Sequence, residues 1–544
     1  MPMPLRPAAV LTQACLLAAL LGCAQVEPMP RDPQARLFAR ALDQIDELYI
    51  VPVTNRVLAL GAAARLSRFD PKLHVTEAPG PREQSETVLT YNDREVASYP
   101  SPQQDDPHLW GAWLGKLESD AKQASSIIAG LTKDELDKAL FDGITGELDR
   151  FSRYSTPQVA RDQRAARDGF GGVGVLLEDD AHPYRITRVM PGSPAALAGI
   201  AVGDRLVAID GEATEGRSQN EVLRQLRGPV ASAVTIEIAH PGAATRSVQL
   251  QRSFIVLPTV TMTRADGVLV FHISGFNQNT TQQLVADLEA AEHDLGPQLR
   301  GVVLDLRGDP GGLLDQSVSL ADVFISKGPI VAAVGRAPAS RQYFEASGDA
   351  IAPRLPVVVL INGGSASAAE ILAAALQDSG RAVVVGTSSY GKGTVQTVLR
   401  LPNDGELILT WAELIAPAGY SLNGHGVVPT VCTSDLGNDV QALETALARA
   451  ADPAARNPLV VTPRAELDQN GWTALRRACP PRRGDRPIDL AVAERVLSDP
   501  VLYARASHVM EPSPSLAAKP VGTAPAAAAH ALTQGYGSLS SSEH

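Results

Sequence analysis

The chain has 544 residues, of which 44% are hydrophobic and 20% are charged, so it is long enough for several domains and has the composition of a soluble globular protein. Its formal net charge is −12, and apart from PPRRGDR at 480–486 it has no dense basic cluster, which argues against a nucleic-acid partner. The cysteine spacing fits no zinc motif, so we expect no metal and no cofactor.

The first segment is typical of an exported protein. Arg6 precedes an apolar stretch from Ala8 to Leu21 that is too short to span a bilayer as a mature helix. The stretch ends in LLGC at 20–23, which resembles the processing site of bacterial lipoproteins and implies lipidation of Cys23. We therefore expect a signal peptide over 1–22 and an exported protein of the cell envelope or periplasm, held at the membrane by lipid. An ordinary signal peptide with an incidental cysteine is the alternative.

Export also bears on the two cysteines far along the chain. Cys432 and Cys479 would lie in an oxidising compartment, and such compartments favour disulfides. A disulfide between them, closing the C-terminal region, is therefore expected.

A helical region is predicted over 37–166, after a Pro-rich linker at 23–36. The apolar residues of LFARALDQIDELYIV (37–51) recur at helical spacing, and DELDKALFDGITGELDRF (134–151) forms a second helical block. The residues between them, 76–133, are polar and contain proline, so we interpret them as an irregular insertion with some helix near 109–130.

The pattern then changes twice. Short β-like runs broken by glycine and proline extend over 167–258, and apolar strand-like runs alternate with helices over 259–435. Continuous apolar strands between helices indicate an α/β core with a largely parallel sheet. A helical C-terminal region is expected over 436–510, in blocks at 436–450 and 487–506, and a disordered tail over 511–544, which is rich in Ala, Pro and Ser.

The region 167–258 resembles a PDZ domain. The likeness rests on GFGGVGVLLE (169–178) and VMPGSPAALAGIAVGDRLVAIDGEAT (189–214), followed by the helix-like SQNEVLRQLRG. It implies a peptide site at the glycine-rich stretch, where N–H groups converge on a C-terminal carboxylate and an edge strand beginning near Val173 accepts a peptide strand. The residues of this site would be Gly172, Val173, Gly174 and Val175. Alternatively, the glycines only shape a turn.

A nucleophilic serine is predicted in the segment 355–397. The strand LPVVVLI leads through a Gly/Ser turn into a helix, so Ser365 or Ser367 lies at a helix N-terminus, where free N–H groups favour developing negative charge. Ser367 and Glu370 also form an S-x-x-E capping box, and this segment taken alone favours a plain helix N-cap as the role of Ser367.

GTSSYGKGT at 386–394 is close to a phosphate-binding loop, which needs a Ser or Thr after the lysine and then a helix. Here Gly393 follows Lys392, and the β-branched stretch TVQTVLRLP predicts a strand. A nucleotide site is therefore disfavoured.

Taken together, NGGSASAAE, SYGKGTVQ, GVVLDLRGDPGGLL (301–314) and GYSLNGHGVVPT (419–430) are similar to the carboxyl-terminal processing, or tail-specific, serine proteases, over about 134–431. The resemblance implies a multidomain α/β protein with a crotonase-like αβ peptidase core, a β-rich PDZ domain and helical N- and C-terminal regions. By position it implies the nucleophile Ser367, the general base Lys392 and the supporting Gln396. Lys392 must be neutral when it accepts the serine proton, a state that desolvation by apolar strands favours.

The oxyanion formed by serine attack needs two aligned donors. The candidates are the N–H of Ala368, in the first helical turn, and one from the pair Gly311 and Gly312, between which the sequence does not decide. A simple Pro-Gly turn is the alternative for RGDPGG. Two residues depart from the family pattern, Asp309 in place of Asn and Thr430 in place of Asp.

The expected partners are protein substrates with accessible C-terminal tails, the membrane through the lipid anchor, and a second copy of the chain or an adaptor protein. A PDZ scaffold with an inactive core and an acyl-CoA enzyme of crotonase-like fold are the rival functions. A histidine triad is disfavoured, because the core has no G-x-S-x-G elbow and, of the ten histidines, only His272 and His425 lie in segments judged plausible for a core position.

Overall fold

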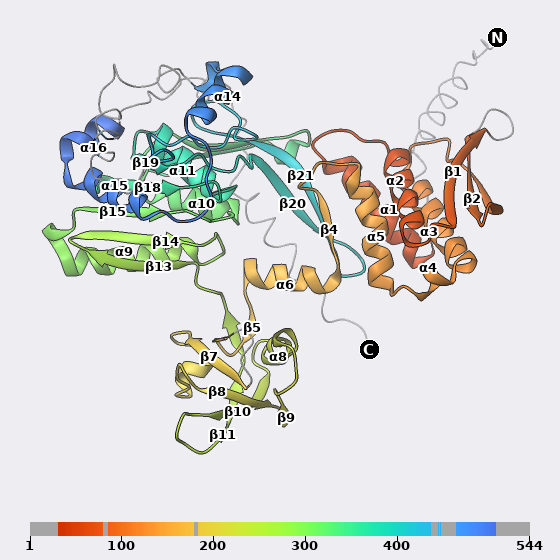
Figure 1. Ribbon diagram of the computed structural model, residues 1–544, viewed down its shortest axis with the longest axis horizontal. Coiled ribbons are helices and arrows are strands. Elements are labelled where there is room, and N and C mark those ends of the chain that lie inside the picture. The colour runs from red at the N-terminus through yellow and green to blue at the C-terminus, as the bar shows by residue number, and fades with distance from the viewer. Residues whose placement is uncertain are drawn as a thin grey trace, which may run out of the picture. The chain divides into compact units, whose positions relative to one another are not determined.

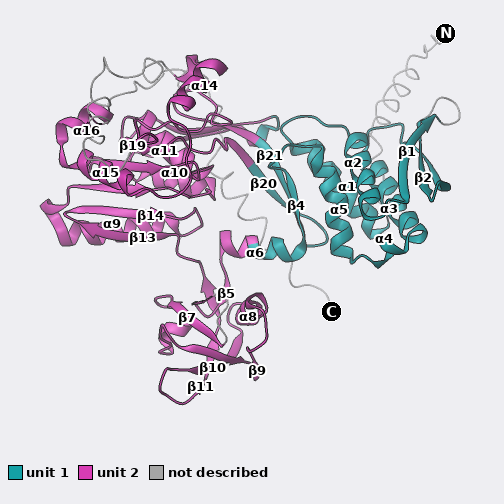
Figure 2. Ribbon diagram, in the orientation of Figure 1, with its two compact units in different colours: residues 1–162, 336–338, 396–411 teal, residues 163–335, 339–395, 412–544 magenta. Residues whose placement is uncertain are grey.

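The computed structural model describes residues 31–79, 85–178, 183–436, 444, 447 and 464–507, and the chain divides into two compact units (Figures 1 and 2). Unit 1 consists of Met1–Asp162, Arg336–Pro338 and Gln396–Trp411, and the remaining residues form unit 2. The predicted signal peptide with Cys23, the predicted tail and nearly all of the predicted helical block at 436–450 lie outside the described residues. Within the described ranges, no helix has the length and apolar character that a membrane span requires.

Helices dominate unit 1, and their apolar faces enclose one core. Phe38, Leu58, Trp110 and Phe141 are buried there on four different helices. The first helix begins at Pro33, because the Asp32 carboxylate accepts the Ala35 N–H and proline suits the first turn, so the predicted linker ends earlier than 36. The helices are α1 (Pro33–Leu48), α2 (Asn55–Phe69), α3 (Pro107–Ala124), α4 (Ser126–Gly130), α5 (Lys133–Gly146) and α6 (Pro157–Asp168), the last of which continues into unit 2.

The expectation that 76–133 is an irregular insertion is wrong, although the helix predicted near 109–130 is confirmed by α3 and α4. Strands β1 (Leu73–Pro79), β2 (Ser85–Tyr91) and β3 (Arg94–Pro100) form an antiparallel sheet, and α3 and α4 occupy most of the rest. The strand pattern is weak in the sequence because most side chains of these strands are at least partly exposed. The turn between β2 and β3 was a usable signal: Asn92 and Asp93 both have positive φ, as a tight hairpin requires.

The region of unit 2 that resembles a PDZ domain is a small β-rich domain with its own core. Its main sheet has the order β11-β10-β8-β7-β6, and β9 pairs with β8. Val173, Ile186, Leu206 and Ile236 are among the buried residues. The elements are β5 (Phe170–Gly172), β6 (Val175–Leu177), β7 (Tyr184–Val189), α7 (Pro194–Leu197), β8 (Arg205–Ile209), β9 (Glu212–Ala213), α8 (Gln219–Leu226), β10 (Ala233–Ala239), β11 (Arg246–Gln251) and β12 (Ser253–Ile255).

The sheet of the PDZ region ends in an edge strand close to the place predicted, but the strand begins at Val175 rather than near Val173. Gly174 interrupts the extended backbone with a φ of +84°, and the Val173 side chain is only 2% exposed. The carbonyl oxygens of Val173 and Gly174 accept the N–H groups of Ala195 and Met190. Val173 is therefore a core residue of this domain, and the peptide-binding role of Gly172, Val173, Gly174 and Val175 stays a prediction.

The region predicted to be a peptidase core has a six-stranded sheet of order β13-β14-β15-β18-β19-β22, in which only β13 is antiparallel to its neighbour. Alternate residues of each strand face opposite layers of helices. Val302 packs in the cluster with α9, α10 and α11, whereas Val303 packs in the cluster with α15 and α16. The multidomain α/β fold class is confirmed.

The strands of this sheet are β13 (Val260–Ala265), β14 (Val268–Ile273), β15 (Gly301–Asp305), β18 (Val357–Ile361), β19 (Ala382–Gly386) and β22 (Val431–Cys432). The helices are α9 (Thr280–Leu295), α10 (Leu314–Asp322), α11 (Ala368–Asp378), α14 (Gln469–Ala478), α15 (Pro487–Ser498) and α16 (Pro500–Ser507). A second sheet contains β16 (Pro329–Val334), β17 (Gln342–Glu345), β20 (Thr394–Arg400) and β21 (Glu406–Ile415), and β4 (Arg153–Ser155) pairs with β21.

Candidate active site

The topology brings three predicted site segments to one edge of the sheet. Strands β15, β18 and β19 are parallel neighbours, so their carboxyl ends lie side by side. The loop after β15 carries Gly311 and Gly312, the loop after β18 carries Ser367, and the loop after β19 carries Lys392. Backbone hydrogen bonds join the loops: Ala366 N–H donates to Asp309 O (2.9 Å), and Tyr390 N–H donates to Ser365 O (3.0 Å).

The structure separates the two candidate serines. Ser365 is fully buried, and its hydroxyl donates to Leu306 O (2.7 Å) and accepts the Asn362 N–H (2.9 Å). Ser367 is partly exposed at the N-terminus of α11. Because the Ser365 hydroxyl holds two loops together and is shielded from solvent, Ser367 is the better candidate nucleophile.

The backbone at Ser367 is in a conformation that side-chain-bearing residues rarely adopt. Its φ is 56° and its ψ is −115°. Such a conformation costs on the order of 1–3 kcal/mol and persists only where the surroundings enforce it. The neighbouring Ala368 N–H, in the first helical turn, is one of the N–H groups at the helix start that face no helical carbonyl.

Glu370 supplies the enforcing contact and is the site residue whose role the sequence understated. Its carboxylate is buried and accepts hydrogen bonds from the N–H groups of Ser367 (2.8 Å), Gly391 (2.6 Å) and Lys392 (2.9 Å) and from the Ser389 hydroxyl. Burial raises the pKa of Glu370, and these hydrogen bonds act in the opposite direction. The S-x-x-E pattern pointed to the bond with Ser367, but no local pattern could point to the donors after β19.

One oxygen of Glu370, Oε2, accepts both the Ser367 N–H and the Lys392 N–H. The backbones of the predicted nucleophile and the predicted base are therefore neighbours, although 25 residues separate them in the sequence. This is the strongest geometric support for their acting together.

The loop of Lys392 lacks the helix that a phosphate site needs. Residues 394–400 form strand β20, so the predicted strand is confirmed. Gly393 is required by a close approach, because an added Cβ would lie 1.9 Å from Asn423 N. Gly393, the residue that departs from the phosphate-binding motif, thus allows the backbone at Asn423 to pack closely against the loop of Lys392.

The two candidate oxyanion glycines differ in their contacts. Gly311 N–H already donates to Asp309 Oδ1 (2.7 Å), whereas within the described residues Gly312 N–H has no acceptor. Gly311 instead provides room, since an added Cβ would lie 2.8 Å from both Ala368 N and Ser367 Cβ. Gly312 N–H and Ala368 N–H are therefore the better pair of candidate donors, and Gly311 permits the close approach of their loops.

Asp309, which departs from the family pattern, is buried beside these glycines. Its Oδ2 atom has no hydrogen-bond partner among the described residues, and burial raises its pKa to about 8, partly offset by the Gly311 N–H. Since the carboxyl is ionised in the unfolded chain above about pH 4, folding takes up a proton between about pH 4 and pH 8. The free energy of unfolding should therefore fall as the pH rises through this window.

We expect Asp309→Asn to remove that pH dependence. The amide retains an acceptor for the Gly311 N–H but carries no ionisable proton. As the pH rises from 5 to 8, the free energy of unfolding of the variant should therefore increase by up to roughly 4 kcal/mol relative to that of the parent protein. Urea unfolding at the two pH values measures the difference, with the exposed Asp349→Asn as the control. Parallel pH profiles for Asp309→Asn and the parent would contradict the prediction.

Three other predicted residues have defined contacts. Gln396 lies on β20, and its amide donates to Thr410 Oγ1 on β21 (3.3 Å), while its role as partner of Lys392 stays a prediction. His425 stacks on Trp472 with ring centroids 4.6 Å apart and bonds to Ser421 O, so it is packed as a structural residue. Thr430 accepts a hydrogen bond from Gln377 (3.0 Å).

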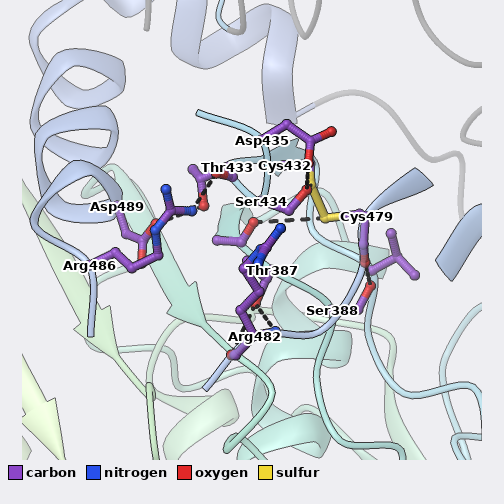
Figure 3. Close-up of a disulfide and its surroundings, with 12 residues drawn as sticks. Thr387, Ser388, Cys432, Thr433, Ser434, Asp435, Cys479, Arg482, Arg486 and Asp489 are labelled. Atoms are coloured by element: carbon purple, nitrogen blue, oxygen red, sulfur yellow. Dashed lines mark hydrogen bonds between the residues drawn. A yellow bond between two sulfur atoms is a disulfide. The ribbon is translucent and has the colours of Figure 1, made fainter. Parts of the chain in front are cut away.

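The disulfide between Cys432 and Cys479 is present in the structure, as expected (Figure 3). It joins the end of β22 to the residue that follows α14. The C-terminal region is thus covalently tied to the edge of the sheet that carries the site loops.

Comparison with known proteins decides the family. A model of peptidase family S41 matches residues 267–433, and a PDZ domain model matches residues 185–239. A carboxy-terminal-processing protease of Bartonella bacilliformis is 37% identical over 297 residues, which are 53% of this chain and 68% of that one. The chain belongs to peptidase family S41.

Other relatives cover similar parts of this S41 peptidase. A "Probable CtpA-like serine protease" of Staphylococcus aureus is 32% identical over 323 residues. These residues are 58% of the present chain and 64% of the relative. A solved structure of a photosystem II D1 C-terminal processing protease aligns with 76% of the S41 peptidase and 96% of its own length, at 26% identity and a TM-score of 0.37. The family match contains Gly311, Ser367, Lys392 and Gln396 and ends before α14.

Proposed function

We propose that this S41 peptidase is an exported serine endopeptidase that binds the C-terminal tails of protein substrates through its PDZ domain and cleaves them with a Ser367–Lys392 dyad. The observation that carries the proposal is the shared hydrogen-bond acceptor, Glu370 Oε2, which holds the backbones of both residues. The strained N-cap at Ser367 and its position at the start of α11 support the same assignment.

In the proposed reaction, neutral Lys392 accepts the proton of the Ser367 hydroxyl as Oγ attacks the carbonyl carbon of the scissile peptide bond. The N–H groups of Ala368 and Gly312 stabilise the oxyanion. When the carbon–nitrogen bond breaks, Lys392 returns the proton to the leaving amine and an ester to Ser367 remains. Water, deprotonated by Lys392, then hydrolyses this acyl-enzyme. Gln396 is assigned to orienting the lysine amine without adding a negative charge that would keep it protonated.

The proposed location is the cell envelope, with a lipid on Cys23 as the anchor. The apolar stretch before LLGC supports it, together with the disulfide Cys432–Cys479, because disulfides persist in oxidising compartments. Incorporation of labelled fatty acid that is abolished in Cys23→Ala is the expected result. Incorporation that is unchanged in that variant would refute the anchor.

The test of the proposed function is covalent labelling with a fluorophosphonate probe on the chain from residue 24. We expect mass spectrometry to place the label on Ser367, and Ser367→Ala to lose both the label and the cleavage of an unstructured substrate. The exposed Ser326→Ala, in the same unit, is the matched control. If the parent protein were unlabelled and inactive while a peptide with a free C-terminus still bound, the rival function of a PDZ scaffold would be favoured.

A further inference from the structure

The segment that follows α14 contacts two of the site loops, although it lies beyond the residues matched by the family model. Ser388 Oγ donates to Cys479 O (2.6 Å), and Gly363 N–H donates to Arg482 O (2.7 Å). Figure 3 shows Arg482 beside Thr387 and Cys479 beside Ser388. The segment after α14 thus contacts both the loop after β18, which carries Ser367, and the loop after β19, which carries Lys392.

Arg476, near the end of α14, reaches closest to the site. Its Nη2 donates to Ser389 O (3.0 Å), and its Nη1 donates to His425 O. Ser389 is the residue whose hydroxyl donates to Glu370 Oε1. The guanidinium therefore holds the main chain of a residue that contacts the carboxylate shared by Ser367 and Lys392.

Glu370 and Arg476 also lie on either side of one small space. A Cβ added to Gly426 would be 2.8 Å from Glu370 Oε1 and 3.1 Å from Arg476 Nη1. Burial lowers the pKa of Arg476, and the negative charge of Glu370 acts in the opposite direction. The positive charge of Arg476 interacts with Glu370 and favours its ionised form, which is the form that can accept from all four of its donors.

The helix that carries Arg476 is firmly anchored. Trp472, Leu475 and Cys479 are buried in the main core of the peptidase region, and Trp472 packs against both Tyr420 and His425. The disulfide to Cys432 fixes the end of the helix. The position of the guanidinium is therefore set by packing and by a covalent bond, as a positioning group requires.

We propose that Arg476 is a positioning residue for the reaction, which holds residues 387–393 and the Glu370 carboxylate in the arrangement that brings Lys392 beside Ser367. This proposal rests on the proposed function of the dyad. Arg476 touches no reacting atom, and it acts through Ser389 and Glu370. The hydrogen bonds of Arg476 thus add to the site a residue that lies beyond position 433, where the family model ends.

The decisive experiment compares Arg476→Ala with Arg477→Ala, an exposed arginine on the same helix. In Arg476→Ala we expect kcat to fall about 10- to 100-fold with little change in KM, because the substrate still binds while the catalytic groups are misplaced. Amide hydrogen exchange should rise in 387–393 and stay unchanged in β14 and β15. Arg477→Ala should match the parent protein in both measurements.

Arg476→Lys is the second variant, for the case in which the alanine protein does not fold. Lysine keeps the charge beside Glu370 but lacks the planar fork that reaches two carbonyls, so kcat should be restored only in part. Unchanged amide hydrogen exchange of residues 387–393 in the Arg476 variants would overturn the proposal. An increase in exchange that is spread evenly over the core strands would also overturn it. If the parent protein cleaved nothing, the proposed function would fail, while the exchange data would still decide whether Arg476 orders the loop.

Discussion

Replacing Lys392 with methionine is expected to lower kcat for tail cleavage by roughly four to six orders of magnitude. Methionine has a similar length and remains apolar, but it cannot accept the Ser367 proton. The fold should survive, because the donor to Glu370 is the backbone N–H of residue 392, which methionine also has. Steady-state kinetics on an unstructured substrate with a free C-terminus measure the loss, and Lys327→Met, at an exposed position of the same unit, is the control.

Lys392→Arg sharpens this prediction. Arginine keeps a positive charge at the site but stays protonated in proteins, so it cannot serve as a general base. We expect it to be about as inactive as the methionine variant. Substantial activity in the arginine protein would mean that the site needs only a cation, and the dyad mechanism would then be wrong.

The second large effect is expected from Gly311→Ala. An added Cβ would lie 2.7 Å from Ala366 O and 2.8 Å from Ala368 N, so the loop after β15 must move away from the nucleophile. If Gly312 N–H and Ala368 N–H bind the oxyanion, this movement removes one aligned donor and should lower kcat roughly 10²- to 10³-fold. The kcat for substrate cleavage and the rate of fluorophosphonate labelling should both fall, and by similar factors.

Gly328→Ala is a closely matched control for that variant. Gly328 has a φ of +98° and Gly311 a φ of +96°, so alanine is strained to the same degree at both positions. An added Cβ at Gly328 meets nothing within 4 Å. The two variants should therefore share the cost of the left-handed backbone, while Gly311→Ala should lose further stability because its Cβ meets backbone atoms. Only Gly311→Ala should lose activity. Equal activity in the two proteins would exclude the proposed oxyanion arrangement.

Much of the peptidase region could be predicted because its rules are local. Strands buried on both faces are continuous apolar runs, so the alternation of strands and helices could be predicted. The grouping of Ser367 and Lys392 came from the resemblance to the tail-specific proteases, and the parallel order of β15, β18 and β19 places their loops at one edge. The strand after Lys392 followed from its β-branched residues. The disulfide followed from the small number of cysteines and the expected compartment.

Other features depend on contacts that no local pattern encodes. Glu370 has the pattern of a capping residue, but three of its four donors come from residues 389–392. The choice between Gly311 and Gly312 depended on Asp309, which takes the Gly311 N–H. The sheet of β1, β2 and β3 was missed because exposed strands lack a strong alternation of polar and apolar residues.

The main-chain hold on Ser367 has a practical consequence. Glu370 accepts the N–H of residue 367, a contact that every residue except proline can make, so removing the hydroxyl leaves the backbone hydrogen bond at residue 367 in place. The Ser367→Ala protein should therefore act as a substrate trap. It should bind its natural substrates without cleaving them, so that the bound substrates can be isolated from the cell together with the variant.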